Sequence, residues 1–220
     1  MKRMGMLSLT CAAALAVACN GNARTDNRTE PAAVGTAGAA DRTAVHDSER
    51  DFVNHQLSDG LAEVELGKLA SERAANPSVK QFAQMLVQDH TNAGTALRET
   101  AMKYGIQPAP QVDDKHKDLM DKLSKLRGAE FDRAYIGAMV DEHKNAVDSL
   151  ESRVDSQGGI TDRLTDKDSA NSRPVPEKSD NAPATAVNTW AAKTLPTVRH
   201  HLDEARMLDD RLDSRQTTKR

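Results

Sequence analysis

Residues 76–105 read NPSVKQFAQMLVQDHTNAGTALRETAMKYG, and this stretch decides the fold. Asn76 and Pro77 are typical of a helix start, because Asn caps free N–H groups and Pro has no N–H to lose there. Gly105 is typical of a helix end, because glycine adopts the left-handed conformation without strain. Between them, apolar residues recur every three or four positions, which is the period of one helix face. That row is Val79, Phe82, Leu86, His90, Ala93, Leu97, Ala101 and Tyr104.

The remaining sequence is also helical, without an alternating β-branched run or a hairpin signal. The same spacing predicts long helices over about 47–75, 129–154 and 187–212, and a shorter one over 113–126. The last long helix carries Pro196, where we expect an interruption. Four long helices and one extra short helix predict an all-α four-helix bundle.

Two segments lack a periodic apolar pattern. Residues 19–46 are rich in Ala, Gly, Thr and Asn, and predict a flexible tether. Residues 155–186 hold a Gly pair, three prolines and many Ser and Asp residues, so they bury too little apolar surface to fold. We expect a disordered insertion at about 155–186 within a single bundle domain over 47–212, because the helix after it is too short to stand alone.

The first 18 residues predict a signal peptide. A basic start is followed by an uncharged, mostly apolar run that is too short to span a bilayer. Small residues precede Cys19, so the segment resembles the lipobox of bacterial lipoproteins, in which that cysteine is lipidated. Ala16-Val17-Ala18 also fits ordinary signal cleavage, which would give a soluble periplasmic or secreted protein. We expect a periplasm-facing lipoprotein, and Asn20 favours the outer membrane by the same resemblance.

Charge and aromatic content limit the classes of binding partner that the sequence allows. The formal net charge is −3 with both signs interspersed, and the chain has only six aromatic residues. We therefore expect no nucleic-acid partner. Cleavage before Cys19 would leave one cysteine and no internal disulfide. The predicted partner is a membrane, through the lipid anchor, and the sequence names no protein partner.

Four metal-capable side chains lie near the middle of the four long helices, on or beside an apolar face. They are Glu63, His90, His143 and His201. A polar group in a bundle core is costly unless it is paired. All four lie within about 5 Å of their helix midpoints at 1.5 Å per residue, so an antiparallel bundle brings them to one level. Three imidazoles and a carboxylate suit one transition-metal ion such as Zn²⁺, Fe²⁺, Cu²⁺ or Mn²⁺.

A simpler interpretation stays open for the same residues. They can form a hydrogen-bonded polar layer that only sets the register of the helices. In either case Asp89, Glu142 and Glu204 flank the histidines at face edges, where they can orient an imidazole or serve as surface charges. The other histidines are expected to face solvent, namely His46, His55, His116 and His200.

Four short motifs carry a family resemblance. They are AEVELG at 62–67, QDHT at 88–91, FDRAY at 131–135 and LPTVRHH at 195–201. Together they resemble the bacterial envelope family known as domain of unknown function 4142, over about residues 48–154 and 187–208. The resemblance implies a ferritin-like four-helix fold in proteins described as outer membrane proteins without an assigned activity. The 155–186 segment looks like an insertion in this family.

A ferritin-like fold invites a di-iron interpretation, but the residues argue against it. Di-iron bundles use Glu-x-x-His motifs, and here Val87, Val140 and Val198 stand three residues before the three histidines. The chain also lacks a Gly-x-Ser-x-Gly elbow, a phosphate-binding glycine loop and a His-Glu-x-x-His motif. We predict no catalytic residues, and expect a binding protein rather than an enzyme.

The leading functional prediction is an envelope-anchored bundle that holds a transition metal, in metal handling or stress protection. One alternative is a structural or interaction protein of the envelope. A weaker alternative is a redox enzyme that uses the same metal.

Overall fold

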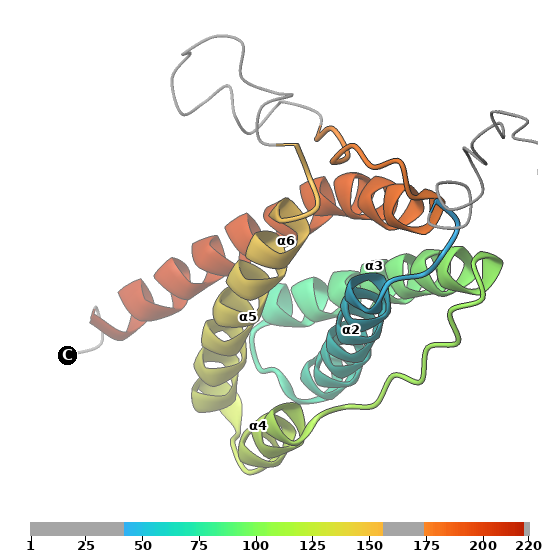
Figure 1. The fold of residues 1–220 in the computed structure, drawn as a ribbon. Helices are drawn as coiled ribbons and strands as arrows, with labels where there is room; N and C mark the ends of the chain where they lie inside the picture. Colours follow the sequence, from blue (N-terminus) through green and yellow to red (C-terminus); the bar gives the residue numbers. More distant parts are fainter. Residues whose placement is uncertain (1–41, 156–173, 218–220) are drawn as a thin grey trace, which may run out of the picture. The chain divides into compact units, whose positions relative to one another are not determined.

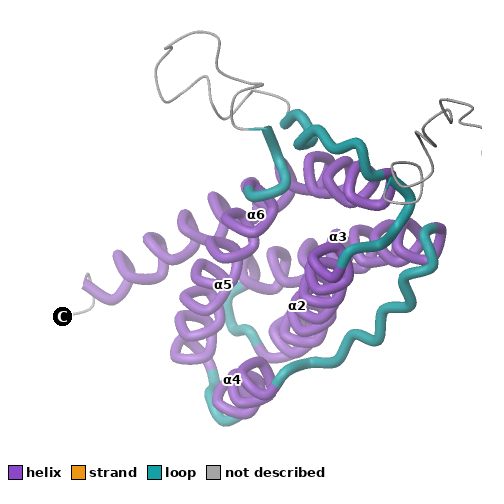
Figure 2. Tube along the Cα trace, in the orientation of Figure 1, coloured by secondary structure: helices purple, strands orange, loops and turns teal. Residues whose placement is uncertain are grey.

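The computed structural model describes residues 42–155 and 174–217, and this part of the chain forms five helices. Figure 1 shows their arrangement. They are α2 (Asp47–Arg73), α3 (Pro77–Lys103), α4 (Asp114–Ser124), α5 (Gly128–Glu151) and α6 (Ala182–Thr217). Within the described ranges no strand is present, only an isolated bridge between Val154 and Pro176 (Figure 2). The predicted all-α class, with four long helices and one short helix, is confirmed.

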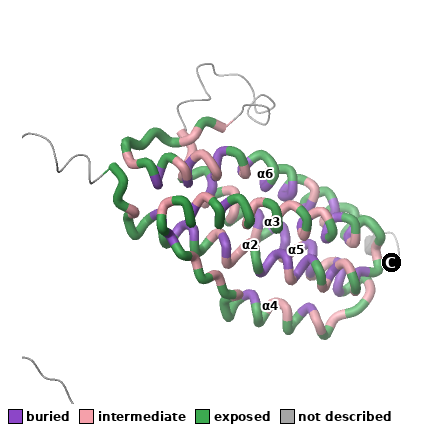
Figure 3. The backbone as a smooth tube through the Cα atoms, turned by 90° about the vertical axis from the view of Figure 1, so that its right-hand side faces the viewer, coloured by how far each residue is buried: buried purple, intermediate pink, exposed green. Residues whose placement is uncertain are grey.

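The long helices pack as a bundle. α2 packs mainly against α3, α5 against α6, and α3 also contacts α6, while α4 lies against α2 and α5. Buried residues line the inward sides of these helices and exposed residues the outward sides (Figure 3). The predicted amphipathic faces therefore form the core. No described helix combines the length and apolar character needed to cross a membrane.

Helix ends follow the local signals. The Asn76 side chain accepts a hydrogen bond from the Ser78 N–H. Gly105 has a φ of 74°, and the Ile106 N–H donates to Ala101 O at 3.0 Å, which closes α3 with a Schellman motif. Buried Ile106 then packs into the core. The sequence therefore predicted both ends of α3 to within one residue.

The turn between α2 and α3 is stabilised by a side chain that is distant in the sequence. The carboxylate of Asp132, on α5, accepts hydrogen bonds from the Ala75 N–H at 2.9 Å and the Asn76 N–H at 2.8 Å. Asp132 is only 2% exposed. Its buried charge is compensated by these two donors, which have no partner within a helix.

The region around α6 differs from the prediction in two ways. The helix runs without a break through Pro196, because neighbours such as Leu195 and Val198 are buried and their packing offsets one lost backbone hydrogen bond. Part of the segment 155–186, predicted as a disordered insertion, has a defined structure. The Asp155 N–H donates to Val175 O and the Glu177 N–H to Arg153 O, and α6 already begins at Ala182. The rest of that segment, 156–173, lies outside the described residues.

Two apolar clusters fill the core, and a polar layer separates them. One cluster lies at the level of the α2–α3 turn and the other at the opposite ends of those helices. On every long helix, a polar residue stands between members of the two clusters. The order is Leu57, Glu63, Leu66 on α2; Leu97, His90, Leu86 on α3; Leu150, His143, Met139 on α5; and Val198, His201, Leu202 on α6.

Candidate metal centre

The three mid-helix histidines meet in the polar layer, which we call the histidine layer together with Glu63. Their ring centroids form a nearly equilateral triangle. The distances are 5.5 Å from His90 to His143, 5.3 Å from His90 to His201, and 5.4 Å from His143 to His201. His143 and His201 are no more than 1% exposed. Residues far apart in the sequence therefore converge as the helix midpoints predicted.

Each imidazole is held by one hydrogen bond on its outer side. His90 Nδ1 lies 2.9 Å from Glu63 Oε2, His143 Nδ1 lies 2.9 Å from Met139 O, and His201 Nε2 lies 2.9 Å from Asp89 Oδ2. A carbonyl or a carboxylate only accepts, so each of these nitrogens carries the proton. These bonds fix both the tautomer and the orientation of each ring.

The opposite nitrogen of each ring has no hydrogen-bond partner among the residues that the structure describes. His90 Nε2, His143 Nε2 and His201 Nδ1 are all buried without a hydrogen bond. One ligand nitrogen from each ring lies within 4.8 Å of the others. Around a tetrahedral ion with metal–nitrogen bonds of about 2.1 Å, imidazole centroids lie about 5.3 Å apart. The observed triangle matches this spacing, so the three rings fit one ion.

The histidine layer keeps its carboxylate charged among the imidazoles. Burial alone would raise the pKa of Glu63, but the nearby imidazoles of His90 and His143 lower that pKa to about 2. Burial lowers the pKa of His90, yet its interaction with Glu63 raises that pKa overall. Burial lowers the pKa of His143, and lowers that of His201 to about 4. The layer therefore holds a Glu63 carboxylate at neutral pH, and burial favours the neutral forms of His143 and His201.

Glu63 takes a different position from the three histidines. Besides His90, its carboxylate lies 3.7 Å from His143 Nδ1, on the outer side of both rings. The group of mutually close ligand atoms contains the three histidines and not Glu63. Sequence reasoning placed Glu63 in the correct layer, and the contacts show it as the partner that orients His90.

The sequence indicated only one of the other two hydrogen-bond partners of the histidines. It predicted Asp89 at a face edge where it could orient an imidazole, and Asp89 does so for His201, 112 residues away. The Met139 carbonyl had no signal in the sequence, because any residue one turn before His143 offers a carbonyl.

The remaining histidines were predicted to face solvent. His46, His55 and His200 are exposed as predicted, whereas His116 is buried, contrary to the prediction.

A small cavity lies beside the histidine layer. It measures about 30 Å³ and is lined by Glu63 and His90 together with small or flat residues such as Gly60, Gly94 and Trp190. A volume of this size holds about one water molecule. The cavity therefore gives the outer side of the Glu63–His90 pair access to water but not to a larger ligand.

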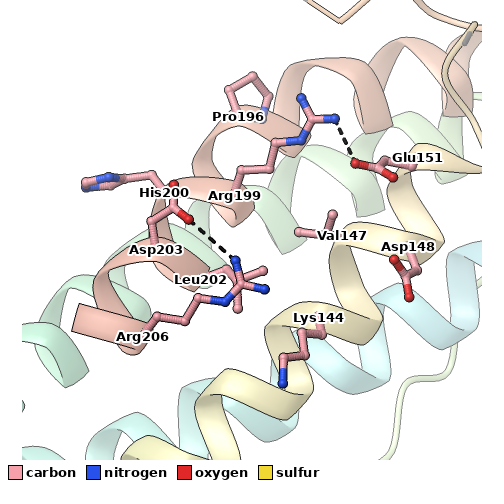
Figure 4. Close-up of a pocket in the computed structure, with 10 residues that line it drawn as sticks. All are labelled: Lys144, Val147, Asp148, Glu151, Pro196, Arg199, His200, Leu202, Asp203 and Arg206. Carbon is pink, nitrogen blue, oxygen red and sulfur yellow. Dashed lines mark hydrogen bonds and ion pairs between the residues drawn. The ribbon is translucent and has the colours of Figure 1, made fainter. Parts of the chain in front are cut away.

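A larger groove of about 640 Å³ lies between α5 and α6 on the outer surface (Figure 4). Its cations are paired with acids: Arg199 lies 2.7 Å from Glu151, and Arg206 lies 3.8 Å from Asp203. The groove therefore has no excess of one charge sign that would point to a ligand.

Comparison with known proteins gives a family and a fold. Residues 34–166, more than half of the chain, match the family described as "Domain of unknown function (DUF4142)". A solved structure, the crystal structure of a DUF305 fragment from Deinococcus radiodurans, is similar with a TM-score of 0.54 and 18% identity. The match covers 77% of this chain and 97% of that one, and at this identity it shows a shared helical fold alone. The shared helical fold agrees with the predicted all-α class. No curated protein matches the chain.

Proposed function

The chain belongs to the DUF4142 family, whose function is unknown, and we propose that it binds one divalent transition-metal ion in the histidine layer. The ligands are His90 Nε2, His143 Nε2 and His201 Nδ1. Glu63, Asp89 and the Met139 carbonyl orient the three rings. A fourth position at the ion is left for water or for a small ligand.

The observation that carries this proposal is the set of three buried ring nitrogens without partners. Each buried polar group left unsatisfied costs about 1–3 kcal/mol. A single ion at the centre of the triangle would satisfy all three groups at once. Three independent hydrogen bonds aim the three rings at that centre.

Charge and donor type favour a particular class of ion. Three neutral imidazoles add no charge, while the Glu63 and Asp89 carboxylates stand directly behind two of the rings. Two negative charges balance one divalent ion. Imidazole nitrogens suit Zn²⁺, Cu²⁺ and Fe²⁺ better than the oxygen-seeking Mg²⁺ and Ca²⁺. We expect Zn²⁺ or Cu²⁺ to bind most tightly.

The biological role that we propose is metal handling or stress protection at the cell envelope. It rests on the signal segment and on lipidation of Cys19, which both lie outside the described residues. Attachment to the outer membrane through that lipid stays a prediction from the sequence.

The alternative function is structural, and one observation favours it. Glu63–His90 joins α2 to α3, and Asp89–His201 joins α3 to α6, so the same bonds fix the helix register without an ion. A polar layer of this kind is known to set register at some cost in stability. Metal content separates the two functions.

The test is elemental analysis of the untagged protein, purified from cells grown with mixed metals and again after reloading with Zn²⁺. We expect about one Zn²⁺ or Cu²⁺ ion per chain in the parent and loss of that ion in His201→Ala. His200→Ala is the matched control, because the neighbouring ring is exposed and lies outside the layer. Circular dichroism checks that each variant is folded, and X-ray absorption of the loaded parent should show nitrogen ligands at about 2.1 Å. A folded parent that takes up no metal would leave only the structural function.

A further inference from the structure

A second group of titratable side chains lies where α4 packs against α2 and α5. It consists of Asp59 from α2, Asp113 and His116 from the start of α4, and Glu142 from α5, and we call it the α4 cluster. Ligand atoms of Asp59, Asp113 and His116 all lie within 4.8 Å of one another. Glu142 Oε2 lies 3.4 Å from His116 Nε2. Three helices thus bring carboxylates around one imidazole.

His116 is the unusual member of the α4 cluster. Its side chain is 4% exposed, although α4 is a short helix at the edge of the bundle. Nδ1 lies 2.7 Å from Asp113 Oδ1, and the Asp113 side chain also accepts from the His116 backbone N–H at 2.8 Å. The ring is therefore held from its Nδ1 side. Its Nε2 is buried and makes no hydrogen bond in the part of the chain that the structure describes.

We propose that the α4 cluster is a second metal site, which takes a divalent ion of the Mn²⁺ type. His116 supplies one nitrogen, and Asp59 and Asp113 supply carboxylate oxygens, because ligand atoms of these three residues lie within 4.8 Å of one another. Glu142, 3.4 Å from His116 Nε2, stands beside the site and can add a further oxygen. An oxygen-rich set with one imidazole suits Mn²⁺, whereas the three imidazoles of the histidine layer suit Zn²⁺ or Cu²⁺.

The α4 cluster lies close to the histidine layer along α2. Asp59 lies one helical turn before Glu63, so the two carboxylates share one face of that helix. A divalent ion beside Asp59 would reduce the repulsion between these two carboxylates.

The competing explanation is a network of ion pairs that needs no metal. His116 would then carry a proton shared between the carboxylates of Glu142 and Asp113. Lys115 Nζ also lies 2.8 Å from Glu142 Oε1 and supplies a second positive charge. These cations and a metal ion compete for the same carboxylates. The two explanations therefore differ in what removal of Lys115 does to metal binding.

The test is a Mn²⁺ titration followed by electron paramagnetic resonance, which reports the free ion. It is run on the parent and on His201→Ala, in which the histidine layer is broken. We expect one bound Mn²⁺ per chain in both, so this result does not depend on the function proposed for the histidine layer. Asp59→Asn and His116→Gln should each weaken binding at least about tenfold. Asp51→Asn, an exposed acid on the same helix, should leave binding unchanged.

Lys115→Gln separates the two explanations most sharply. Removal of a unit positive charge within several ångström of a divalent ion should tighten Mn²⁺ binding about fivefold. In a pure ion-pair network, none of these proteins would bind Mn²⁺ at α4. Nuclear magnetic resonance of the parent needs no substitution: bound Mn²⁺ should broaden the His116 ring signals before those of the exposed His46 and His200. Absence of bound Mn²⁺, or broadening that spares His116, would overturn the proposal.

Discussion

Glu63→Gln is the substitution that separates an orienting partner from a metal ligand. The Glu63 carboxylate lies 2.9 Å from His90 Nδ1, and both side chains are no more than 10% exposed. Glutamine keeps the shape but replaces the charge by an amide, which holds the ring less firmly and in a less basic state. Loss of such a partner typically weakens metal binding about 10–100-fold.

The expected size of the effect follows from ligand linkage. At a free Zn²⁺ concentration of about 1,000 times the parent dissociation constant, the ion adds about 4.1 kcal/mol to the free energy of unfolding. At the same concentration a variant with affinity weakened about 10–100-fold gains only about 2.7–1.4 kcal/mol. Loss of a direct ligand would cost more, as in His201→Ala.

Urea unfolding with and without Zn²⁺ measures this difference. Trp190 is the single tryptophan, and it packs edge-on against Phe52 at 6.3 Å, so its fluorescence should report loss of the core. Each protein is compared with its own metal-free form, because the substitution also removes the Glu63–His90 ion pair. Glu65→Gln on the same helix is the control, since Glu65 pairs only with exposed Lys68.

Two results would refute the reasoning. Equal stabilisation by Zn²⁺ in the parent and in Glu63→Gln would mean that the carboxylate does not act on the site. Complete loss of stabilisation, equal to that of His201→Ala, would mean that Glu63 binds the ion directly, as first predicted from the sequence.

Three further predictions concern stability. Gly67→Ala should destabilise the fold by about 1–3 kcal/mol in urea unfolding, because the added Cβ would lie 2.7 Å from Val87 Cγ2. Gly60→Ala, with open space around its Cβ, should instead stabilise the fold by about 0.5–1 kcal/mol. Equal effects of the two substitutions would contradict the packing argument. The carboxylates of Glu142 and Asp113 beside the ring raise the pKa of His116 from 6.5 to about 9. The stabilisation by the charged ring is therefore complete below pH 6.5 and is lost as the pH rises through about 9. Because one of its carboxylate partners is half exposed, we expect this loss to be about 1–2 kcal/mol, measured as thermal unfolding against pH and absent in His116→Gln. Asp132→Ala should lower the free energy of unfolding by about 1–3 kcal/mol, because it leaves two backbone N–H groups of the α2–α3 turn without their acceptor. An unchanged midpoint of urea unfolding would show that water replaces the carboxylate.

The sequence was sufficient where a property depends on near neighbours in the chain. The start of α3 at Pro77 and its end before Gly105 follow from capping groups one to three residues away. His90 and His143 were predicted to face the core because the helical period puts them in line with apolar residues. Pro196 was misjudged because a lost local hydrogen bond was weighed without the burial of the residues around it.

The sequence was not sufficient where partners come from other helices. A helical period indicates which face a residue lies on, but not which ring nitrogen points inward or which acid stands behind it. The bond from His201 to Asp89 spans 112 residues, and the burial of His116 depends on how short α4 docks against α5.

Sequence alone therefore determined that the chain forms these helices, where α3 begins and ends, and the level at which three histidines meet, because these depend on local periodicity and rise per residue. The tertiary structure alone decided the roles within that level. It made Glu63 a partner of His90, left three ring nitrogens facing one another, and assembled the α4 cluster. The physical reason is that side-chain orientation is set by hydrogen-bond partners that packing brings together, and packing between helices is not encoded in any single stretch.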